Sequence, residues 1–229
     1  MLKREILDIL AGAGKTGWVL EPDAKGLLAL AGLMVPRFTR AMTPEEALQF
    51  AGEIGYPVVA KVVSPEILHK SDVAGVAVGI QGEEALRDVF QRFSTLEGFC
   101  GVLVEEMVAG LELIIGAKID YQFGPVILLG IGGTGVEIYR DASIRMAPLK
   151  KADVRSMISG LKAHQLLEGY RGRTSIGIAA LTKTLLALSD LVVELGGRIE
   201  SMDLNPVMCT ADACIVADAR IVLPRENNS

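Results

Sequence analysis

The sequence predicts an α+β fold built from two lobes. Up to about residue 99, short helical and extended patterns alternate; beyond it strand patterns dominate, and the remaining helical patterns gather within residues 151–195. Helices that are grouped apart from the strands are typical of α+β architecture. A chain of 229 residues is also long enough for two lobes with their own cores. We expect a small lobe over residues 21–99 and a larger lobe over residues 1–20 and 100–229.

Helix and strand signals in the first hundred residues define the elements of the small lobe. Residues 21–30 begin with an acidic, proline-containing helix start. Thr43, Pro44 and Glu46 have the spacing of a capping box with proline at the first helical position. Valine-rich runs predict strands in the same region. We therefore expect helices over residues 21–30, 44–53 and 82–96, and strands over residues 56–63 and 76–80.

The second half of the chain predicts a larger sheet followed by grouped helices. The longest apolar stretch, residues 176–195, is interrupted by polar residues such as Lys183 and Asp190. This pattern indicates a buried amphipathic helix and not a membrane span. Two or three helices should fill residues 151–195 in all. From apolar, β-branched runs we expect strands over residues 102–107, 111–120, 125–129, 136–139, 144–147, 199–203 and 214–222.

Charge and the start of the chain narrow the classes of function. Lysine and arginine number 23 against 28 aspartates and glutamates, which gives a formal net charge of −5, and no basic run is present. A nucleic-acid partner is therefore not expected. The start of the chain places Glu5 and Asp8 inside its apolar pattern and lacks the layout of a signal peptide. The cytoplasm is accordingly the expected location.

Three cysteines lie in apolar surroundings without the spacing of a metal site. They are Cys100, Cys209 and Cys214. An odd number of cysteines in such surroundings favours buried thiols in a reducing compartment. A disulfide between Cys209 and Cys214 across a hairpin is the alternative, which intracellular proteins outside hyperthermophiles seldom use.

Polar residues in two extended segments near the end of the chain predict a metal site. Asp203 and Asn205 are two residues apart, so in a strand their side chains point to the same face. Asp218 lies in a following extended segment. Carboxylate and amide oxygens suit Mg²⁺, whose coordination is commonly completed by substrate phosphates. The pattern predicts a site for magnesium and a nucleotide; the alternative is a simple turn, which the pair Asn205 and Pro206 favours.

Two glycine motifs resemble known phosphate-binding loops but depart from them. Residues 12–16 look like the end of a P-loop, yet the motif requires glycine where the chain has Ile9, and no strand precedes it. Residues 130–135 fit Gly-x-Gly-x-x-Gly, but another strand pattern follows instead of the helix that would hold a pyrophosphate. We therefore expect no dinucleotide fold. Residues 130–135 predict either a close backbone approach to a ligand or an ordinary glycine hairpin.

A lysine and a polar loop supply positive charge that a nucleotide would need. Lys61 lies in an otherwise apolar strand, and a buried ammonium is costly unless it meets an anion. We expect a phosphate or a carboxylate beside it; the alternative is an edge strand whose lysine reaches solvent. The loop that begins His69, Lys70 and Ser71 is suited to folding over phosphates and excluding water.

Other charged pairs allow both a functional and a plain interpretation. Glu105 and Glu106 end one predicted strand, and Glu112 begins the next. Such carboxylates can bind ribose hydroxyls or a metal, although adjacent acids at a strand end are more often solvated charge. Arg171 and Arg173 have the spacing to clamp a phosphate, but solvated charge at a helix end is the better interpretation.

Five ordered segments together resemble the ATP-grasp family. The likeness extends over residues 21–222 and is to the beta subunit of ADP-forming acetyl-CoA (acyl-CoA) synthetase. The resemblance implies an ATP-grasp fold whose two α+β lobes clasp an adenine nucleotide. It also implies the reaction of acyl-CoA, ADP and phosphate to acid, CoA and ATP through phosphohistidine. The matching segments are residues 55–61, 69–76, 103–107 with Glu112, 123–126 with 130–133, and 203–207.

The resemblance assigns roles to particular residues. His69 matches the histidine that accepts a phosphoryl group from a partner's phosphohistidine and hands it to ADP, and a neutral imidazole is a nucleophile near pH 7. Asn205 and Asp218 would ligate Mg²⁺ in the larger lobe, with Asp203 close by. His164 matches no motif and is expected to be structural. The resemblance assigns contacts with ATP or ADP to Lys61, Lys70, Ser71, Glu105, Met107, Val108 and Glu112.

Within that set, the resemblance distinguishes three parts of the nucleotide. Lys61 would contact the phosphates. Glu105 and the backbone of Met107 and Val108 would hold the adenine, and Glu112 would bind the ribose.

The resemblance further implies a partner. A CoA-binding Rossmann domain and the first phosphorylated histidine would belong to an alpha subunit, in an α2β2 heterotetramer whose beta chain alone binds nucleotide without turning over acyl-CoA. Two alternatives stay open. One is an ATP-grasp ligase that joins a carboxylate to an amine and needs no phosphorylated histidine. The other is a non-catalytic nucleotide-binding subunit.

Overall fold

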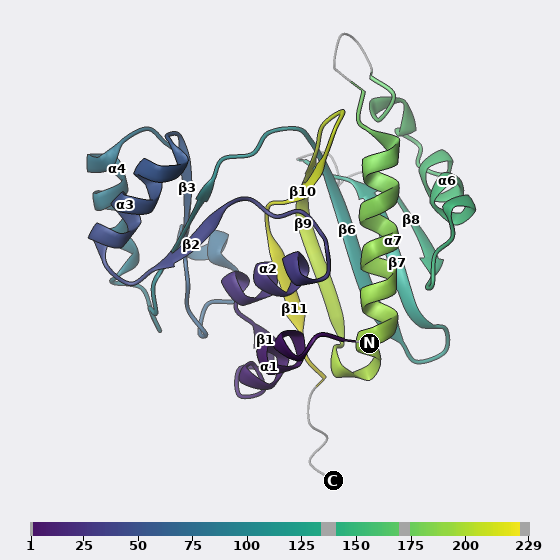
Figure 1. The fold of residues 1–229 in the computed structure, drawn as a ribbon, viewed down its shortest axis with the longest axis horizontal. Helices are drawn as coiled ribbons and strands as arrows, with labels where there is room; N and C mark the ends of the chain where they lie inside the picture. The colour runs from purple at the N-terminus through teal and green to yellow at the C-terminus, as the bar shows by residue number, and fades with distance from the viewer. Residues whose placement is uncertain (1, 134–140, 170–174, 225–229) are drawn as a thin grey trace. The chain divides into compact units, whose positions relative to one another are not determined.

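The fold consists of helices and antiparallel sheets that group into two compact units (Figure 1). The structure, a computed structural model, describes residues 2–133, 141–169 and 175–224. The smaller unit comprises Leu20–Pro22 and Pro36–Val108. The larger unit comprises Met1–Val19, Asp23–Val35 and Ala109–Ser229. The α+β class expected from the sequence is confirmed.

The smaller unit is a four-stranded antiparallel sheet with two helices. The strands run in the order β2 (Phe38–Ala41), β5 (Val102–Glu106), β3 (Val58–Val62) and β4 (Val76–Ile80). Helices α3 (Pro44–Ile54) and α4 (Glu83–Phe93) bury their apolar faces against one side of this sheet. Alternate residues of β3, namely Val58, Ala60 and Val62, join the core under these helices. Val59 and Lys61 consequently lie on the opposite face of β3.

The start of α3 follows the predicted capping box with one difference. The Thr43 hydroxyl accepts a hydrogen bond from the Glu46 backbone nitrogen at 3.2 Å, as expected for the N-cap. The Glu46 carboxylate, however, accepts from the Met42 backbone nitrogen at 2.6 Å. Both side chains therefore satisfy backbone donors at the start of the helix, and the predicted helix start is confirmed.

The larger unit is a seven-stranded sheet covered on one face by helices, among the residues that the structure describes. The strand order is β1, β11, β9, β6, β7, β8, with β10 paired to β9, and every pairing is antiparallel. The strands are β1 (Trp18–Val19), β6 (Leu111–Asp120), β7 (Gly124–Ile131), β8 (Ala142–Met146), β9 (Ser201–Cys209), β10 (Cys214–Val216) and β11 (Ala219–Val222). The helices are α1 (Arg4–Gly12), α2 (Glu21–Leu30), α6 (Lys151–Ser159) and α7 (Ile178–Leu195), with short 3-10 turns at His164–Leu166 and Gly196–Arg198. The first two residues of α2 group with the smaller unit.

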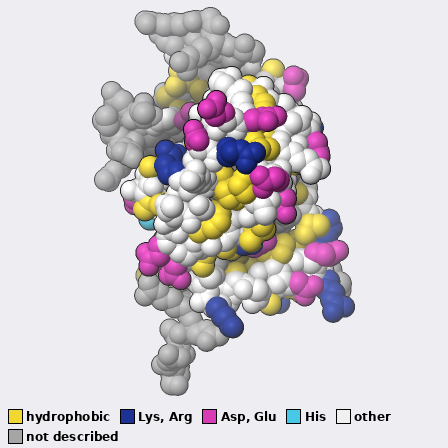
Figure 2. Space-filling model, turned by 90° about the vertical axis from the view of Figure 1, so that its left-hand side faces the viewer, with side chains coloured by type: hydrophobic (Ala, Val, Ile, Leu, Met, Phe, Trp, Pro, Cys, Tyr) yellow, Lys and Arg dark blue, Asp and Glu magenta, His cyan; other side chains and the backbone are white. Residues whose placement is uncertain are grey.

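Helix α7 is the long apolar helix that the sequence predicts. It packs on β6 and β7 in the larger unit, as Figure 1 shows, and buries Leu181, Leu185, Leu188 and Val192 in the core. None of the described helices combines the length and apolar character that a membrane span requires. On the face of the molecule shown in Figure 2, acidic and basic side chains are interspersed.

The division into units departs from the expected lobe boundaries at two places. Residues 23–35 group with the larger unit, although residues 21–99 were expected to form the small lobe. The strand β5 groups with the smaller unit because it pairs between β2 and β3. The strand expected over residues 136–139 lies outside the described residues.

Asn205 and Pro206 lie inside strand β9 and not in a turn. Leu113 of β6 pairs with Val207, and Ile115 pairs with Leu204, so β9 contains one extra residue over this stretch. This is a β-bulge, a position that tolerates proline and re-aims neighbouring side chains. The alternative interpretation of this segment as a turn is therefore wrong.

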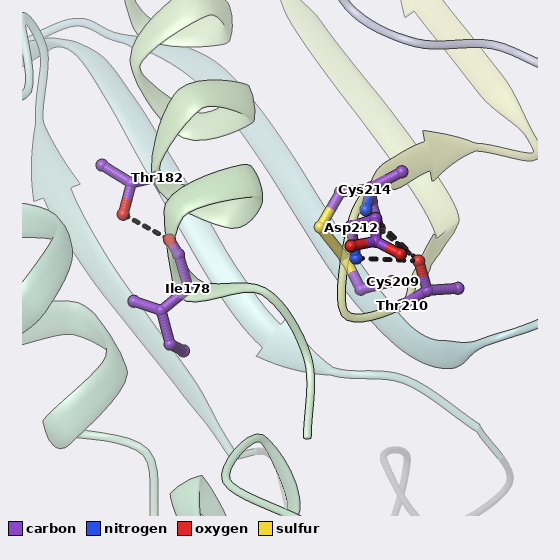
Figure 3. Close-up of a disulfide and its surroundings, with 7 residues drawn as sticks. Ile178, Thr182, Cys209, Thr210, Asp212 and Cys214 are labelled. Carbon is purple, nitrogen blue, oxygen red and sulfur yellow. Dashed lines mark hydrogen bonds between the residues drawn. A yellow bond between two sulfur atoms is a disulfide. The ribbon is translucent and has the colours of Figure 1, made fainter. Parts of the chain in front are cut away.

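Cys209 and Cys214 form a disulfide, so the expectation of thiols at these two positions is wrong (Figure 3). The two residues are direct partners in the pairing of β9 with β10, with Cα atoms 4.2 Å apart. The hairpin closes where the Thr210 nitrogen donates to the Ala213 carbonyl at 2.8 Å. Cys100 is a thiol whose sulfur contacts the Val63 carbonyl oxygen at 3.2 Å. The sequence favoured thiols because it does not reveal this strand register.

We expect reduction of the disulfide to lower the free energy of unfolding by about 2 kcal/mol, because the bond restricts the unfolded chain and closes only a short loop. Urea unfolding with and without dithiothreitol measures the change. The double variant Cys209→Ala/Cys214→Ala is the control, and its midpoint should not respond to dithiothreitol. An unchanged midpoint for the wild-type chain after verified reduction would show that the disulfide does not stabilise the fold.

Candidate functional site

Lys61 is buried in the smaller unit and is paired with two carboxylates. Its strand β3 lies between β5 and β4, so the alternative of an edge strand is wrong. The ammonium nitrogen is 2.7 Å from Glu21 Oε1 and 3.0 Å from Glu105 Oε1. Glu105 lies on β5 opposite Val59, two residues along from Lys61, so both side chains share one face of the sheet. The predicted anion beside Lys61 is confirmed, and it is a carboxylate pair.

Glu21 belongs to this site although the sequence pattern does not mark it as a site residue. It is the first residue of α2 and is only 2% exposed. Its second oxygen, Oε2, is 2.8 Å from the ammonium nitrogen of Lys70. An acidic residue in the first turn of a helix usually interacts favourably with the helix dipole. This common role accounts for Glu21 in the sequence, so nothing there indicates a buried ion pair. Two lysines and two glutamates thus form one buried ionic network.

The loop after β3 presents His69 at the surface. His69 is exposed and immediately precedes the 3-10 turn Lys70–Val73. Ser71 is also exposed, whereas the Lys70 side chain is only 13% exposed because it turns toward Glu21. The turn ends at Ala74 in the left-handed region, at φ 50°. The backbone therefore directs His69 outward while Lys70 points inward.

Gly75 connects this loop closely to the sheet. Its nitrogen donates to the Lys70 carbonyl at 2.7 Å, and its own carbonyl accepts from the Val62 nitrogen at 2.8 Å. A Cβ atom at Gly75 would lie 2.6 Å from Val62 Cγ1. No side chain larger than hydrogen fits without displacing the strand or the loop.

The substitution Gly75→Ala should therefore lower the free energy of unfolding by about 1–3 kcal/mol through overpacking. Urea unfolding measures the change. Gly52→Ala in α3 is the matched control: a Cβ there meets nothing within 4 Å, so it should be neutral or stabilising. A wild-type midpoint for Gly75→Ala would contradict the tight contact between the loop and β3.

The residues at the end of β5 and just after it separate into inward and outward groups. Glu105 is buried against Lys61, whereas the Glu106 carboxylate is 3.5 Å from the exposed Arg37 side chain. The interpretation of this acidic pair as solvated charge therefore suits Glu106 and not Glu105. Met107 follows and is 42% exposed, and Val108 is half-buried. The structure thus places both predicted adenine-contacting backbone positions at an accessible end of β5.

In the larger unit, two of the three predicted magnesium ligands are neighbours. The Asn205 backbone nitrogen donates to the Asp218 carbonyl oxygen at 3.2 Å, across the bulge in β9. Asp203 lies two residues before Asn205, but its carboxylate is 3.4 Å from the Arg220 guanidinium. Asn205 and Asp218 together offer an amide and a carboxylate oxygen, which suit Mg²⁺. Asp203 has Arg220 as a partly exposed ion-pair partner, and its role as a magnesium ligand stays a prediction.

The magnesium ligand set is small on the protein side. The described residues contain no group of three or more histidine, cysteine, aspartate or glutamate side chains arranged to hold a metal. A site built on Asn205 and Asp218 would therefore need oxygens from water or substrate phosphates, as magnesium commonly does.

The glycine segment after β7 approaches Glu112 closely. The Gly132 nitrogen donates to the Glu112 carbonyl oxygen at 2.7 Å, and a Cβ at Gly132 would lie 2.8 Å from that oxygen. Gly133 follows with φ +91°. These contacts explain why glycine is needed at position 132, where the chain lies against the Glu112 backbone; the approach to a ligand stays a prediction. Residues 134 and 135 of the motif lie outside the described residues.

The remaining candidates are peripheral to these groups. The His164 ring nitrogen Nδ1 is 2.9 Å from the Leu161 carbonyl oxygen, which fits the expected structural role. Arg171 and Arg173 lie outside the described residues.

Fold and sequence together define the class of protein. The ATP-grasp domain model matches residues 11–223, which is nearly the whole chain. The chain therefore belongs to the ATP-grasp family.

Within that family, the chain is similar to ADP-forming acyl-CoA synthetases. It is 41% identical to the beta subunit of acetate–CoA ligase [ADP-forming] I of Pyrococcus furiosus, over 90% of this chain and 91% of the relative. It is also 41% identical to acetate–CoA ligase [ADP-forming] II of Archaeoglobus fulgidus, over 90% of this chain but only 30% of that longer protein.

A solved structure of an acetyl-coenzyme A synthetase is also similar to this chain in fold and sequence. An acetyl-coenzyme A synthetase of Candidatus Korarchaeum cryptofilum, in complex with coenzyme A and Mg-AMPPCP, matches with a TM-score of 0.84 and 40% identity. The match covers 96% of this chain and all of that one. In that protein a phosphohistidine segment points towards the nucleotide-binding site.

Proposed function

We propose that this chain is the nucleotide-binding beta subunit of an ADP-forming acyl-CoA synthetase, which with an alpha subunit converts acyl-CoA, ADP and phosphate into acid, CoA and ATP. The observation that carries the proposal is the exposed His69 held next to the buried lysine and glutamate network. An accessible imidazole is a nucleophile suited to phosphoryl transfer. The relatives and the solved structure support the same reaction.

His69 is the phosphoryl relay in this proposal. A ring nitrogen of His69 attacks the phosphorus of the partner's phosphohistidine, forming one N–P bond as the other breaks. A β-phosphate oxygen of ADP then attacks the phosphorus on His69, which releases the imidazole and yields ATP. Lys61 and Lys70 offset negative charge on the phosphates during the second step. The exposure of His69 suits a residue that must meet a group from another chain.

The other predicted nucleotide contacts keep their roles as part of the proposal. Lys70 and Ser71 in the loop contact phosphates with Lys61. Met107 and Val108 offer backbone groups to the adenine at the end of β5, and Glu112 offers its carboxylate to the ribose. Because the Glu105 side chain contacts Lys61, its contribution to adenine binding would be the orientation of β5 and of the lysine.

Magnesium is the metal that we propose for Asn205 and Asp218. Bound there, it would neutralise charge on the nucleotide phosphates. The solved synthetase with bound Mg-AMPPCP supports this assignment. Asp203 would support the site through its ion pair with Arg220.

We also propose an alpha partner and an α2β2 assembly in the cytoplasm. The Pyrococcus relative is a beta subunit, and the Archaeoglobus relative joins a matching segment to a much longer chain. Both facts support a second polypeptide, or its equivalent, that supplies CoA binding and the first phosphohistidine.

Reconstitution tests the proposal. Acetyl-CoA, ADP and phosphate should yield ATP when this chain is combined with a matching alpha subunit, and neither chain alone should turn over. The chain alone should still bind Mg-ATP in calorimetry. ATP-dependent coupling of a carboxylate to an amine, or nucleotide binding with no turnover in any combination, would overturn it.

A further inference from the structure

Glu21 connects the two lysines on which the proposed transfer depends. Its carboxylate oxygens contact ammonium groups from two different segments: Lys61 in the middle of β3, at 2.7 Å, and Lys70 beside His69, at 2.8 Å. From this geometry we infer that Glu21 is a positioning residue that holds the His69 loop in register with Lys61. The inference rests on the proposed function of His69.

The two lysines depend on Glu21 to different degrees. Lys61 has a second carboxylate, Glu105, at 3.0 Å, and lies in a strand held on both sides. Lys70 lies in a short 3-10 turn, and Glu21 joins its side chain to the core of the unit. Loss of the Glu21 charge should therefore displace Lys70 more than Lys61.

Burial makes these contacts strong. The side chains of Glu21, Lys61 and Glu105 are 1%, 8% and 3% exposed, so solvent screens them little. The Lys61 ammonium donates a charge-assisted hydrogen bond to Glu21 Oε1 at 2.7 Å, and such bonds are about twice as strong as neutral ones. The contact of Lys70 with Glu21 Oε2 is an ion pair without hydrogen-bond geometry. Removing the Glu21 carboxylate would take away the anion that Lys61 and Lys70 share, and the side chain in the short turn, Lys70, is the one freer to move outward.

Lys70 and His69 are adjacent in the chain, so the displacement of Lys70 moves His69. The backbone of the loop is fixed to β3 at the other end, where Gly75 and Val62 share a hydrogen bond. The Glu21 contact fixes the near end. Both ends are therefore needed to hold the imidazole in one position relative to the phosphates that Lys61 contacts. Misplacement of a reacting group by about 1 Å can slow a reaction about 100-fold.

The test uses Glu21→Gln in the full chain, with Glu45→Gln as the matched control. Glu45 pairs with Arg87 at the exposed start of α3 and lies outside the network. Each protein is incubated with magnesium and ATP labelled in the γ-phosphate, and label on His69 is followed with time. In this reaction a ring nitrogen of His69 bonds to the γ-phosphorus and ADP leaves. We expect Glu21→Gln to label about 10- to 100-fold more slowly at saturating Mg-ATP, with weaker Mg-ATP affinity because Lys70 is a proposed phosphate contact, and Glu45→Gln like the wild type.

Hydrogen exchange of the loop supplies a readout that does not require activity. Amide exchange over residues 69–75 should accelerate in Glu21→Gln, while α3 and α4 retain wild-type protection. Lys70→Gln leaves the pair of Glu21 with Lys61 intact and should show the same slow labelling and fast exchange. The double variant should be no slower than Lys70→Gln alone, because both substitutions break one link.

The outcomes separate this inference from the proposed function. If the wild-type chain is labelled and Glu21→Gln and Lys70→Gln are labelled at the same rate, the inference is overturned and the proposed function stands. Additive losses in the double variant would likewise exclude action of Glu21 through Lys70. If the wild-type chain takes no label, the proposed function fails, and unchanged loop exchange in the variants would then overturn the inference as well. Should Glu21→Gln not fold, amide exchange of the loop in Lys70→Gln decides: faster exchange supports the inference and wild-type exchange overturns it.

Discussion

Replacement of His69 by alanine should lower turnover by several powers of ten and leave the affinity for Mg-ATP nearly unchanged. Deletion of a nucleophile removes the chemical step itself, whereas the lysines proposed to contact the phosphates stay in place. His69 is exposed, so its truncation should not disturb the core. Steady-state turnover with an alpha partner and calorimetric titration of Mg-ATP measure the two quantities.

His164 offers a matched control, because the chain contains only two histidines. His164→Ala should retain turnover close to that of the wild type, since His164 contacts the Leu161 carbonyl and has no proposed role in transfer. Loss of nucleotide affinity in His69→Ala would mean that the residue shapes the loop. Full activity in His69→Ala would support an ATP-grasp ligase without a histidine relay.

Lys61→Ala should differ from His69→Ala, because it should weaken nucleotide binding, turnover and stability together. The substitution leaves Glu21 and Glu105 buried without their shared ammonium. Removing one member of a buried ion pair typically costs about 3–5 kcal/mol in the free energy of unfolding, and here two buried carboxylates lose an ammonium group that they share. Urea unfolding and calorimetry with Mg-ATP measure both effects.

Lys118→Ala is the matched control for this substitution. Lys118 also lies in a strand, β6, but its side chain is exposed, and such surface changes usually alter stability by no more than about 0.5 kcal/mol. If Lys61→Ala unfolds at the same urea concentration as the wild type, the ion network does not support the fold. If its nucleotide affinity is also unchanged, Lys61 does not contact the phosphates.

Local signals in the sequence were sufficient for much of the fold. The capping residues Thr43 and Glu46 and the apolar run of α7 predicted their elements because each depends on neighbouring residues along the chain. The burial of Lys61 likewise followed from its apolar strand, and burial required an anion.

Features that depend on pairing between distant segments were not predictable from the sequence. Glu21 reaches Lys61 across 40 positions of the chain, and nothing in its own neighbourhood marks it as buried. The disulfide depends on the register between β9 and β10, which places Cys209 opposite Cys214. Asp203 was grouped with Asn205 by spacing alone. In the structure its carboxylate pairs with Arg220 on the neighbouring strand.

The measurement that tests the central role of His69 most directly is the transfer of a labelled γ-phosphate from ATP. The purified chain is incubated with magnesium and labelled ATP, with and without an alpha partner, and acid-labile label is mapped by mass spectrometry. We expect label on His69, which passes to a histidine of the partner and is released when CoA and acid are added. Nucleotide binding without label on any histidine would contradict the relay and would favour a carboxylate–amine ligase or a non-catalytic subunit.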